Sequence, residues 1–374
     1  MKSRTGYAIG IGLFILCLAL ALIISRLTRK VQSQPPVLSG ARLEEFTSLD
    51  PIDAHTHISQ TDPAFFGMLE RLHMHVLDIL YVDDTDPYRT SLKPQKLYAL
   101  RLVDSTVGHV QLCTTFDPYQ FDKVNFSKDA IDALNQDFAS GAVAVKIWKN
   151  IGMEIKNASG RYLMPDDPLF EPIYRDIAAH DKTLITHAAD PDTAWGSQNP
   201  EGLSTPYYET HPQWDMSRKP GAPEKIAILE ARDHLLAMNP GLRVVGAHFG
   251  SMEDHLDELA SRLELYPNFA VDTAARVRRL IFQPRDKVRA FILKYQDRIL
   301  YGTDLHFYSG TTNPSVSQAW EEQYALDWRY FATDDTFEYR GHRVEGLNLP
   351  RPVLKKLYHD NAVHWIPGVV ANLH

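Results

Sequence analysis

Short apolar runs alternate with amphipathic stretches along the chain from about residue 48 onward. The runs are rich in β-branched and aromatic residues and are short, which favours strands over helices. The expected strands are 52–55, 75–81, 110–116, 142–148, 183–187, 243–248, 268–272 and 299–304. The pattern therefore predicts eight strands separated by other elements.

The stretches between these runs have the start and stop signals of helices. Ser127 is a candidate N-cap for one of them, and Pro168 stands at the first helical position of another. The expected helices are 127–141, 167–180, 223–238, 252–266, 283–295 and 350–365. Strands that alternate with helices predict βαβ units and a parallel sheet. Eight units predict an α/β fold closed into a (β/α)8 TIM barrel, with a doubly wound sheet as the alternative.

The N-terminus has a different pattern. Residues 6–25 are uncharged and mostly apolar, with basic residues on both sides. About 20 such residues are enough to cross a membrane as a helix. A transmembrane or signal-anchor helix is favoured over a cleaved signal peptide, because the small-residue site at 19–21 would lie inside the run. We expect a membrane-anchored protein with an extracytoplasmic catalytic domain, organised as 1–30 anchor or signal segment, 31–47 tether and 48–374 barrel.

Composition narrows the range of partners. The net charge of −8 lacks the basic footprint of a nucleic-acid-binding protein. The two cysteines are Cys17, inside the N-terminal run, and Cys113, so no disulfide is expected within the barrel. The expected partner is a small-molecule substrate.

Two connections between the expected elements are long and rich in aromatic residues. They are 188–223, after the fifth strand, and 306–349, after the eighth. Long loops after strands are often functional, and barrels build their active sites at this end of the strands. We expect both connections to form lids or pocket walls, with a plain insertion or an oligomer contact as the alternative.

Residues able to bind a metal stand at the ends of several strands. His55 and His57 are two apart and so share one face of the first strand. The same alternation is expected to turn three further residues inward, which are Lys146, His187 and His248. Asp304 ends the eighth strand in the same phase. Imidazoles with a carboxylate suit Zn²⁺, and also Fe, Ni or Mn.

This ordered set resembles the amidohydrolase superfamily. The similarity is strongest to the amidohydrolase-related branch that contains the aminocarboxymuconate-semialdehyde decarboxylase group, and it covers roughly residues 48–368. The resemblance implies one or two divalent ions, most simply Zn²⁺, and a water molecule activated at the barrel mouth. It also implies that His55, His57 and His187 are ligands and that Asp304 is a ligand or a proton-transfer base. His248 would bind a second ion or polarise the substrate.

Lys146 has three open roles. The resemblance implies that it is carboxylated and bridges two ions, and this is the interpretation we favour. An unmodified ammonium would instead grip a substrate carboxylate or act as an electrophile, because burying it without a partner is costly. Lys149 is a less favoured substitute.

Other residues near the strand ends have supporting roles in this prediction. Trp148 and Arg276 are expected to contact the substrate, with Arg276 and Asp272 orienting an anionic group. A surface salt bridge or helix cap is the alternative for that pair. Asp53 is expected to orient a histidine. His306 is expected to line a loop rather than to bind metal.

Three functions fit these residues. The first is metal-dependent hydrolysis of an amide, lactone or similar C–N or C–O bond. The second is non-oxidative decarboxylation of an unsaturated or aromatic acid, which the same branch supports. The third is an inactive, membrane-tethered binding barrel. That last class should have lost a ligand, whereas here all are present. Homo-oligomers are frequent in the superfamily, so a homo-oligomer is an open alternative to a monomer, although no segment of the sequence demonstrates one.

Overall fold

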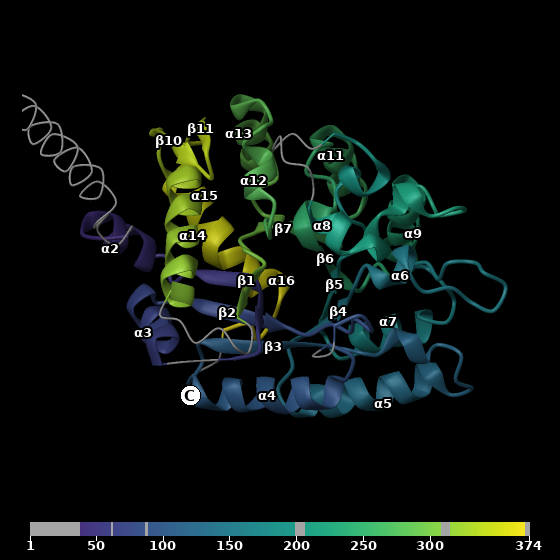
Figure 1. Cartoon of the computed structure of the whole chain (residues 1–374). Helices are drawn as coiled ribbons and strands as arrows, with labels where there is room; N and C mark the ends of the chain where they lie inside the picture. Colours follow the sequence, from purple (N-terminus) through teal and green to yellow (C-terminus); the bar gives the residue numbers. More distant parts are fainter. Residues whose placement is uncertain (1–37, 61–62, 87–88, 199–205, 308–314, 371–374) are drawn as a thin grey trace, which may run out of the picture.

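The computed structural model describes residues 38–370 apart from 61–62, 87–88, 199–205 and 308–314. Its main element is a parallel sheet of nine strands in the order β8-β7-β6-β5-β4-β3-β2-β1-β9. Figure 1 labels β1 to β7 of this sheet. The strands are β1 (Ile52–Ile58), β2 (His75–Ile79), β3 (Val110–Thr115), β4 (Ala144–Ile147), β5 (Thr183–Thr186), β6 (Arg243–Gly246), β7 (Phe269–Asp272), β8 (Ile299–Leu300) and β9 (Leu305–Phe307). All eight expected strands are present, and β9 is additional.

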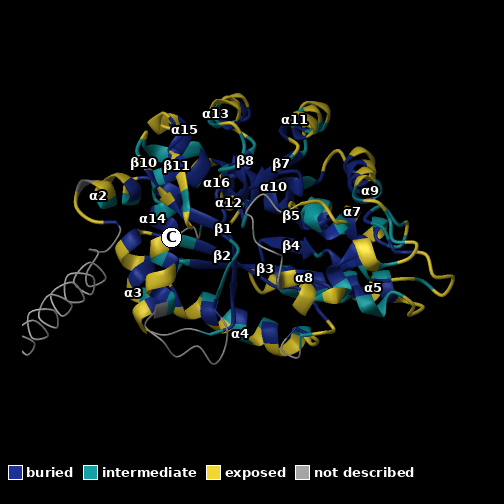
Figure 2. Ribbon diagram, turned by 45° about the horizontal axis from the view of Figure 1, so that its top comes forward, coloured by how far each residue is buried: buried dark blue, intermediate teal, exposed yellow. Residues whose placement is uncertain are grey.

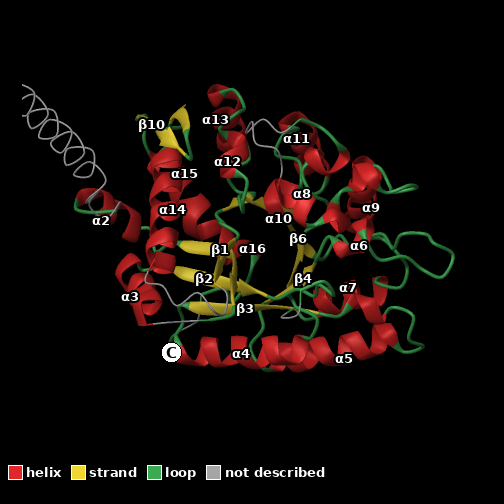
Figure 3. Ribbon diagram, viewed as in Figure 1, coloured by secondary structure: helices red, strands yellow, loops and turns green. Residues whose placement is uncertain are grey.

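The sheet curls until its two ends meet. β8 and β9 follow each other closely in the chain, yet β8 pairs with β7 and β9 pairs with β1. Across this seam Ala54 N donates to Tyr301 O at 2.9 Å, and Asp304 N donates to His55 O at 2.8 Å. Helices surround the curled sheet (Figure 3). The α/β class is confirmed, and the architecture is TIM-barrel-like.

The helices between the strands cover the outside of the sheet. They are α3 (Pro63–Leu72), α4 (Leu92–Ser105), α5 (Phe126–Ala139), α7 (Glu171–Ala179), α9 (Lys225–Met238), α11 (Leu256–Leu265) and α13 (Arg285–Lys294). The strands are buried almost throughout, while exposed residues lie on the outer surfaces of the helices (Figure 2). The apolar runs of the sequence are thus strands covered by protein on both sides, as parallel sheets require.

One end of the curled sheet is closed by the C-terminal segment. Trp365 and Ile366, in and after α16 (Asn361–Trp365), pack into one apolar cluster with inward-facing strand residues such as Ile52, Ile185 and Leu300. Thr183 Oγ1 donates to Trp365 O at 2.5 Å, which fixes this plug to β5. The opposite end, formed by the C-terminal ends of the strands, holds the polar side chains.

The second long connection differs from its expected role. It contains α14 (Ser315–Ala332) and a hairpin of β10 (Thr336–Tyr339) and β11 (His342–Glu345). Its aromatic side chains are buried in the outer core, and Trp320 packs edge-on against Phe65 of α3 with ring centroids 5.0 Å apart. The expectation that these aromatic residues form a lid or pocket wall is therefore wrong for this connection. They attach α14 to the side of the barrel.

The N-terminal expectation is corrected in one respect. Within the described part of the chain, the structure contains no helix that is both long and apolar enough to cross a membrane. This finding contradicts the expected membrane-anchored location. The run 6–25, on which that expectation rested, lies outside the described residues. The described part begins just before α2 (Ala41–Thr47), whose Phe46 packs against Trp328 and Tyr358.

Candidate active site at the barrel mouth

A cavity of about 910 Å³ opens where the strands end. It brings together eight of the residues that the sequence placed in the site. These lining residues come from six strands or the turns that follow them, and they are His55, His57, Lys146, Trp148, His187, His248, Arg276 and Asp304. The polar end of the barrel is therefore a single concave site.

His55 is held by a buried carboxylate. Its Nδ1 donates to Asp272 Oδ2 at 2.8 Å, and both side chains are almost fully buried. The other oxygen of Asp272 accepts from the backbone N of His248 at 2.8 Å. Because Nδ1 is engaged by Asp272, Nε2 of His55 is left to face Asp304 and Lys146 in the cavity. The expected role of Asp272 in orienting a substrate is thus replaced in this structure by a contact with His55.

A register shift in β1 changes which of its residues face the inside of the barrel. The pairing of β1 with β2 shifts between Asp53 and Thr56, which is the mark of a bulge. Ala54 before the shift packs in the inner apolar cluster, whereas His55 and His57 line the cavity. Bulges often lie beside active sites because they redirect side chains. Simple alternation would place Asp53 on the same face of the strand as His55 and His57. The bulge breaks this alternation.

Asp53 ties two strands together instead of orienting an imidazole. Its Oδ1 accepts from the backbone N of His55 and of Thr303, at 3.1 and 3.0 Å. Its Oδ2 accepts from Thr303 Oγ1 at 2.6 Å and from Tyr324 OH at 3.1 Å. Burial raises the pKa of this carboxyl to about 7. Asp53 therefore fixes the backbone beside His55 and beside Asp304.

His57 is oriented by a backbone carbonyl. Its Nδ1 donates to Ile79 O at 2.6 Å, and its Nε2 lies 3.2 Å from Asp304 Oδ1. Burial and the neighbouring His306 lower the pKa of His57 well below its usual value. With Nδ1 held by Ile79 O, Nε2 of His57 is directed toward Asp304.

His248 reaches the cavity from a turn rather than from a strand. β6 ends at Gly246, and His248 has a left-handed backbone with φ 59°. Alternation along β6 would place it on the same face as Val244, which packs in the outer core. Its Nδ1 donates to Ala274 O at 3.0 Å, and burial lowers its pKa well below the usual value. His248 lines the cavity as expected. The turn after β6 places it there, and not alternation along the strand as predicted.

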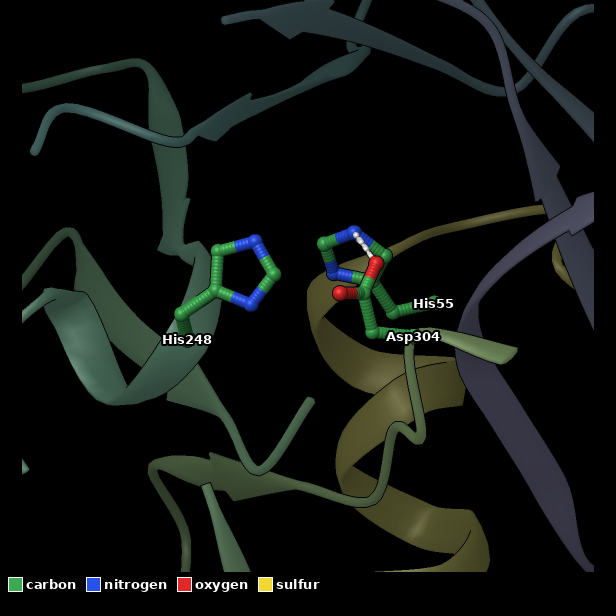
Figure 4. A group of neighbouring side chains, drawn as sticks. All are labelled: His55, His248 and Asp304. Carbon is green, nitrogen blue, oxygen red and sulfur yellow. Dashed lines mark ion pairs between the residues drawn. The ribbon is translucent and has the colours of Figure 1, made fainter. Parts of the chain in front are cut away.

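Asp304 stands at the centre of the histidines. β8 ends at Leu300, and Asp304 has a left-handed backbone, with φ 64°, directly before β9 begins at Leu305. Oδ1 lies 3.6 Å from His55 Nε2, and Figure 4 shows this pair with His248 facing it. Burial raises the pKa of Asp304, but the nearby His248, His306 and His57 more than offset this and hold it well below the usual range. The carboxylate is ionised.

Two groups of these side chains could hold a metal ion. One is His55, His248 and Asp304, and the other is His57, Asp304 and His306, with the donor atoms of each group within 4.8 Å of one another. Two donors that each lie about 2.1 Å from one ion are about 3.4 Å apart in a tetrahedral site. The separations of 3.2 to 3.7 Å between Asp304 Oδ1 and the imidazoles of His55, His57 and His306 fit that value. Histidines held at Nδ1 are also the usual form of metal ligands.

Lys146 lies beside the first group. It is 1% exposed, and its Nζ lies 3.3 Å from His55 Nε2. Burial lowers the pKa of Lys146 to about 8, although the charges of Asp272 and Asp304 oppose this. Its alternation with Ala144, which packs in the inner cluster, is as expected.

His187 faces a second polar network. Its ring packs against His248 with centroids 4.2 Å apart, but its Nε2 lies 3.3 Å from Asp190 Oδ1. Lys149 donates to both oxygens of Asp190 at 2.9 and 2.7 Å, and to Tyr207 OH at 2.9 Å. His187 is thus next to the metal-binding groups while its Nε2 is directed at a carboxylate. Asp190 was not predicted as a site residue, although it lies three residues after His187 in the sequence.

The remaining walls combine cations with aromatic rings. Arg276 Nε lies 3.1 Å from Glu253 Oε1, and both side chains are buried. Trp148 packs between Tyr81 and Trp214, with ring centroids 4.6 and 4.9 Å away. Arg276 and Trp148 therefore line the cavity as expected, and Arg276 already has an acidic partner.

Comparisons with known proteins agree with this geometry. A family model described as Amidohydrolase matches residues 127–367, a range that contains Lys146, His187, His248 and Asp304. A search of curated proteins finds no match. Among solved structures, an uncharacterized TIM-barrel protein from Bordetella bronchiseptica is 12% identical, with 85% of this chain and 99% of that chain covered and a TM-score of 0.50.

Two solved enzymes are similar at lower TM-scores. A 2,6-dihydroxybenzoate decarboxylase from Rhizobium is 12% identical over 84% of this chain and 98% of that chain, with a TM-score of 0.48. A dihydroorotase from Campylobacter jejuni is 13% identical over 84% of this chain and 82% of that chain, with a TM-score of 0.42. The family assignment rests on the family model, which covers most of the barrel. The chain belongs to the amidohydrolase family.

Proposed function

We propose that this protein is a metal-dependent hydrolase that directs water onto a C–N or C–O bond of a small molecule, such as an amide or a lactone. One observation carries the proposal. Asp304 is a carboxylate whose Oδ1 lies within 3.7 Å of the imidazoles of His55, His57 and His306. A carboxylate in that position can take a proton from an attacking water within the cavity.

Under this proposal His55, His57, His248 and Asp304 hold the ion, most simply Zn²⁺, and His187 and Lys146 adjoin it. A bound divalent ion would lower the pKa of water and polarise a carbonyl oxygen. The chain contributes the orientation. Asp272, Ile79 and Ala274 each accept the Nδ1 proton of one histidine, so that each Nε2 is directed into the site.

Lys146 supports either one ion or two. Its lowered pKa of about 8 leaves part of the population as the neutral amine at neutral pH. The neutral amine is the form that carboxylation requires, and a carboxylated side chain would bridge a second ion. Unmodified, the same group would donate a proton or hydrogen bond to the substrate oxygen. We keep the bridging role as part of the proposal.

The cavity walls favour a substrate with an apolar or planar part and a modest charge. Trp148 and Tyr81 offer ring surfaces, which bind flat apolar groups. The cations Lys149 and Arg276 lie on the same walls, but each is already paired with a carboxylate, Asp190 and Glu253. Paired cations attract an anionic substrate less strongly than free ones do. This supports hydrolysis of a substrate that is neutral or weakly charged.

Non-oxidative decarboxylation is the second candidate. The observation in its favour is that Lys146, Lys149 and Arg276 line one cavity together with the rings of Trp148 and Tyr81. An aromatic or unsaturated acid would place its ring on those side chains and its carboxylate near the cations. The same metal-binding residues serve both reactions.

Isotope labelling distinguishes the two reactions. The metal-loaded protein is incubated in H₂¹⁸O with a panel of amides and lactones, and in parallel with aromatic acids. Hydrolysis incorporates ¹⁸O into the carboxyl product, whereas decarboxylation releases CO₂ and replaces the lost group by hydrogen. We expect labelled product from the first panel. Turnover of only the second panel would reject the hydrolase proposal.

Asp304→Asn tests the proposed base. Loss of a general base should reduce kcat by about 10²–10⁴-fold. Asp181→Asn is a matched control, because Asp181 also has a left-handed backbone, with φ 56°, but its side chain is 78% exposed outside the cavity. Asparagine tolerates this backbone conformation at both positions. Equal turnover in both variants would remove the assigned role of Asp304.

A further inference from the structure

Asp83 is a buried carboxylate in the wall of the cavity, four residues after the end of β2. It is 8% exposed and belongs to the residues that line the cavity. Its Oδ1 accepts from the backbone N of Thr85 at 2.8 Å and from Thr85 Oγ1 at 2.6 Å. Within the described part of the chain, no Lys, Arg or His nitrogen lies within 4.0 Å of either carboxylate oxygen. Because a buried carboxylate without a cation is costly, a cation that enters the cavity would stabilise it.

The basic side chain on the same wall belongs to another carboxylate. Lys149 Nζ donates to both oxygens of Asp190, at 2.9 and 2.7 Å. Burial lowers the pKa of Lys149, and the charges of Asp190 and, more weakly, of Asp83 oppose this. The charges of Lys149 and Asp190 cancel each other, so the carboxylate of Asp83 is left over on this wall.

Aromatic rings connect Asp83 to the centre of the site. Tyr81 is two residues before Asp83, and its ring packs against His57 and Trp148 with centroids 5.1 and 4.6 Å away. Ring faces attract cations as well as flat apolar groups. Two extended residues span at most about 7 Å. A positively charged group at Asp83 would therefore lie along the Tyr81 ring, a few bonds from an atom held beside His57.

The carboxylate of Asp83 is held in place by its neighbours. Thr85, whose hydroxyl donates to Asp83, accepts from Gln213 Nε2 of the first long connection at 3.1 Å. The backbone N of Asp83 donates to Arg89 O at 3.2 Å. A group that is fixed before its ligand arrives loses little conformational entropy on binding. Asp83 is thus preorganised for a ligand in the cavity.

We propose that Asp83 determines specificity by binding a basic nitrogen of the substrate, so that the substrates are small amides or lactones that carry an amine. The inference rests on the proposed function, because it assumes that the bond to be hydrolysed lies at Asp304. An ammonium group has three N–H donors for the carboxylate of Asp83, and its charge suits the face of Tyr81. The same carboxylate repels an acidic group, so Asp83 favours basic over acidic substrates.

The test measures binding to the Zn²⁺-loaded protein and needs no turnover. The probes are 5-aminopentanohydroxamic acid and hexanohydroxamic acid, which share one metal-binding group and one chain length but end in an ammonium or a methyl group. We expect calorimetry to show that the ammonium probe binds about tenfold more tightly to the wild-type protein. Asp83→Asn should lose this preference and keep its affinity for hexanohydroxamic acid. Asp84→Asn is the matched control and should keep the preference, because Asp84 is an exposed carboxylate that does not line the cavity.

Three results would overturn the inference and leave the proposed function in place. One is equal affinity of the wild-type protein for the two probes, or no binding of either. Another is an ammonium preference that is unchanged in Asp83→Asn. The third is tighter binding of adipic acid monohydroxamate, which carries a carboxylate at the same position, than of the ammonium probe. A protein that takes up no divalent metal before the probes are added would instead reject the proposed function.

Discussion

The two long connections of this barrel are alike in sequence and different in structure. Both follow strand ends and both are rich in aromatic residues. In the first, Tyr207 and Tyr208 of α8 (Pro206–Thr210) line the cavity. In the second, Trp320 and Trp328 of α14 are buried against the side of the barrel. Aromatic content alone therefore does not distinguish a pocket wall from an added layer of core.

The difference follows from helical spacing. Trp320, Tyr324 and Trp328 are four residues apart in turn and so form one stripe along a helix. The side chains of that stripe pack against α3 and against the core beside it. The aromatic residues Trp195, Tyr207 and Trp214 of the first connection lie in three separate short helices instead. Lys149 holds Tyr207 by a hydrogen bond. A stripe predicts stability, and scattered rings next to polar strand ends predict binding.

The largest expected effect tests the buried connection. Trp320→Ala should lower the free energy of unfolding by about 3–5 kcal/mol, because Trp320 is 1% exposed and its removal leaves a cavity beside Phe65. Zn²⁺ affinity measured under folding conditions should be unchanged.

Tyr207→Ala is the matched aromatic truncation in the first connection, where Tyr207 is 42% exposed. It should cost less than about 1.5 kcal/mol and should change KM. Equal losses of stability would remove the distinction between the connections.

A smaller effect is expected where the first connection meets the barrel. Lys149→Met leaves Asp190 as a buried carboxylate without its cation, which typically costs about 3 kcal/mol. Chemical denaturation measures the loss. The double substitution Lys149→Met with Asp190→Leu removes both charges and should recover most of it. A double variant as unstable as Lys149→Met alone would show that packing, rather than charge, sets the cost.

Much of the fold and part of this site follow from the sequence. The position of Lys146 agrees with alternation along β4, and the family was identified from the ordered ligands. The bulge in β1 and the left-handed turn at His248 break the alternation locally. The pairing of His57 with His306 depends on how the first and last strands meet. That contact joins residues about 250 positions apart, which local patterns do not specify.

The smallest expected effect is a pH dependence at the cavity wall. Burial lowers the pKa of His187 to about 3, from 6.5 in the unfolded chain. The folded state therefore binds fewer protons than the unfolded state below pH 6.5, so the stability of the metal-free protein falls as pH falls through that range. Between pH 7 and pH 5 this histidine should cost about 2 kcal/mol. His187→Gln lacks the ionisable group, and its unfolding free energy should gain that amount relative to the wild-type protein. Parallel pH curves would contradict the assigned environment of His187.

The central claim is a metal site built around Asp304, and equilibrium dialysis of the metal-free protein against Zn²⁺ tests it most directly. The wild-type protein and Asp181→Asn should retain at least one equivalent of Zn²⁺. Asp304→Asn should bind it more than about 100-fold more weakly, because the carboxylate common to both groups of ligands is gone. Wild-type protein that retains no Zn²⁺, Mn²⁺ or Fe²⁺ after dialysis, or Asp304→Asn that binds as tightly as the wild type, would contradict the account.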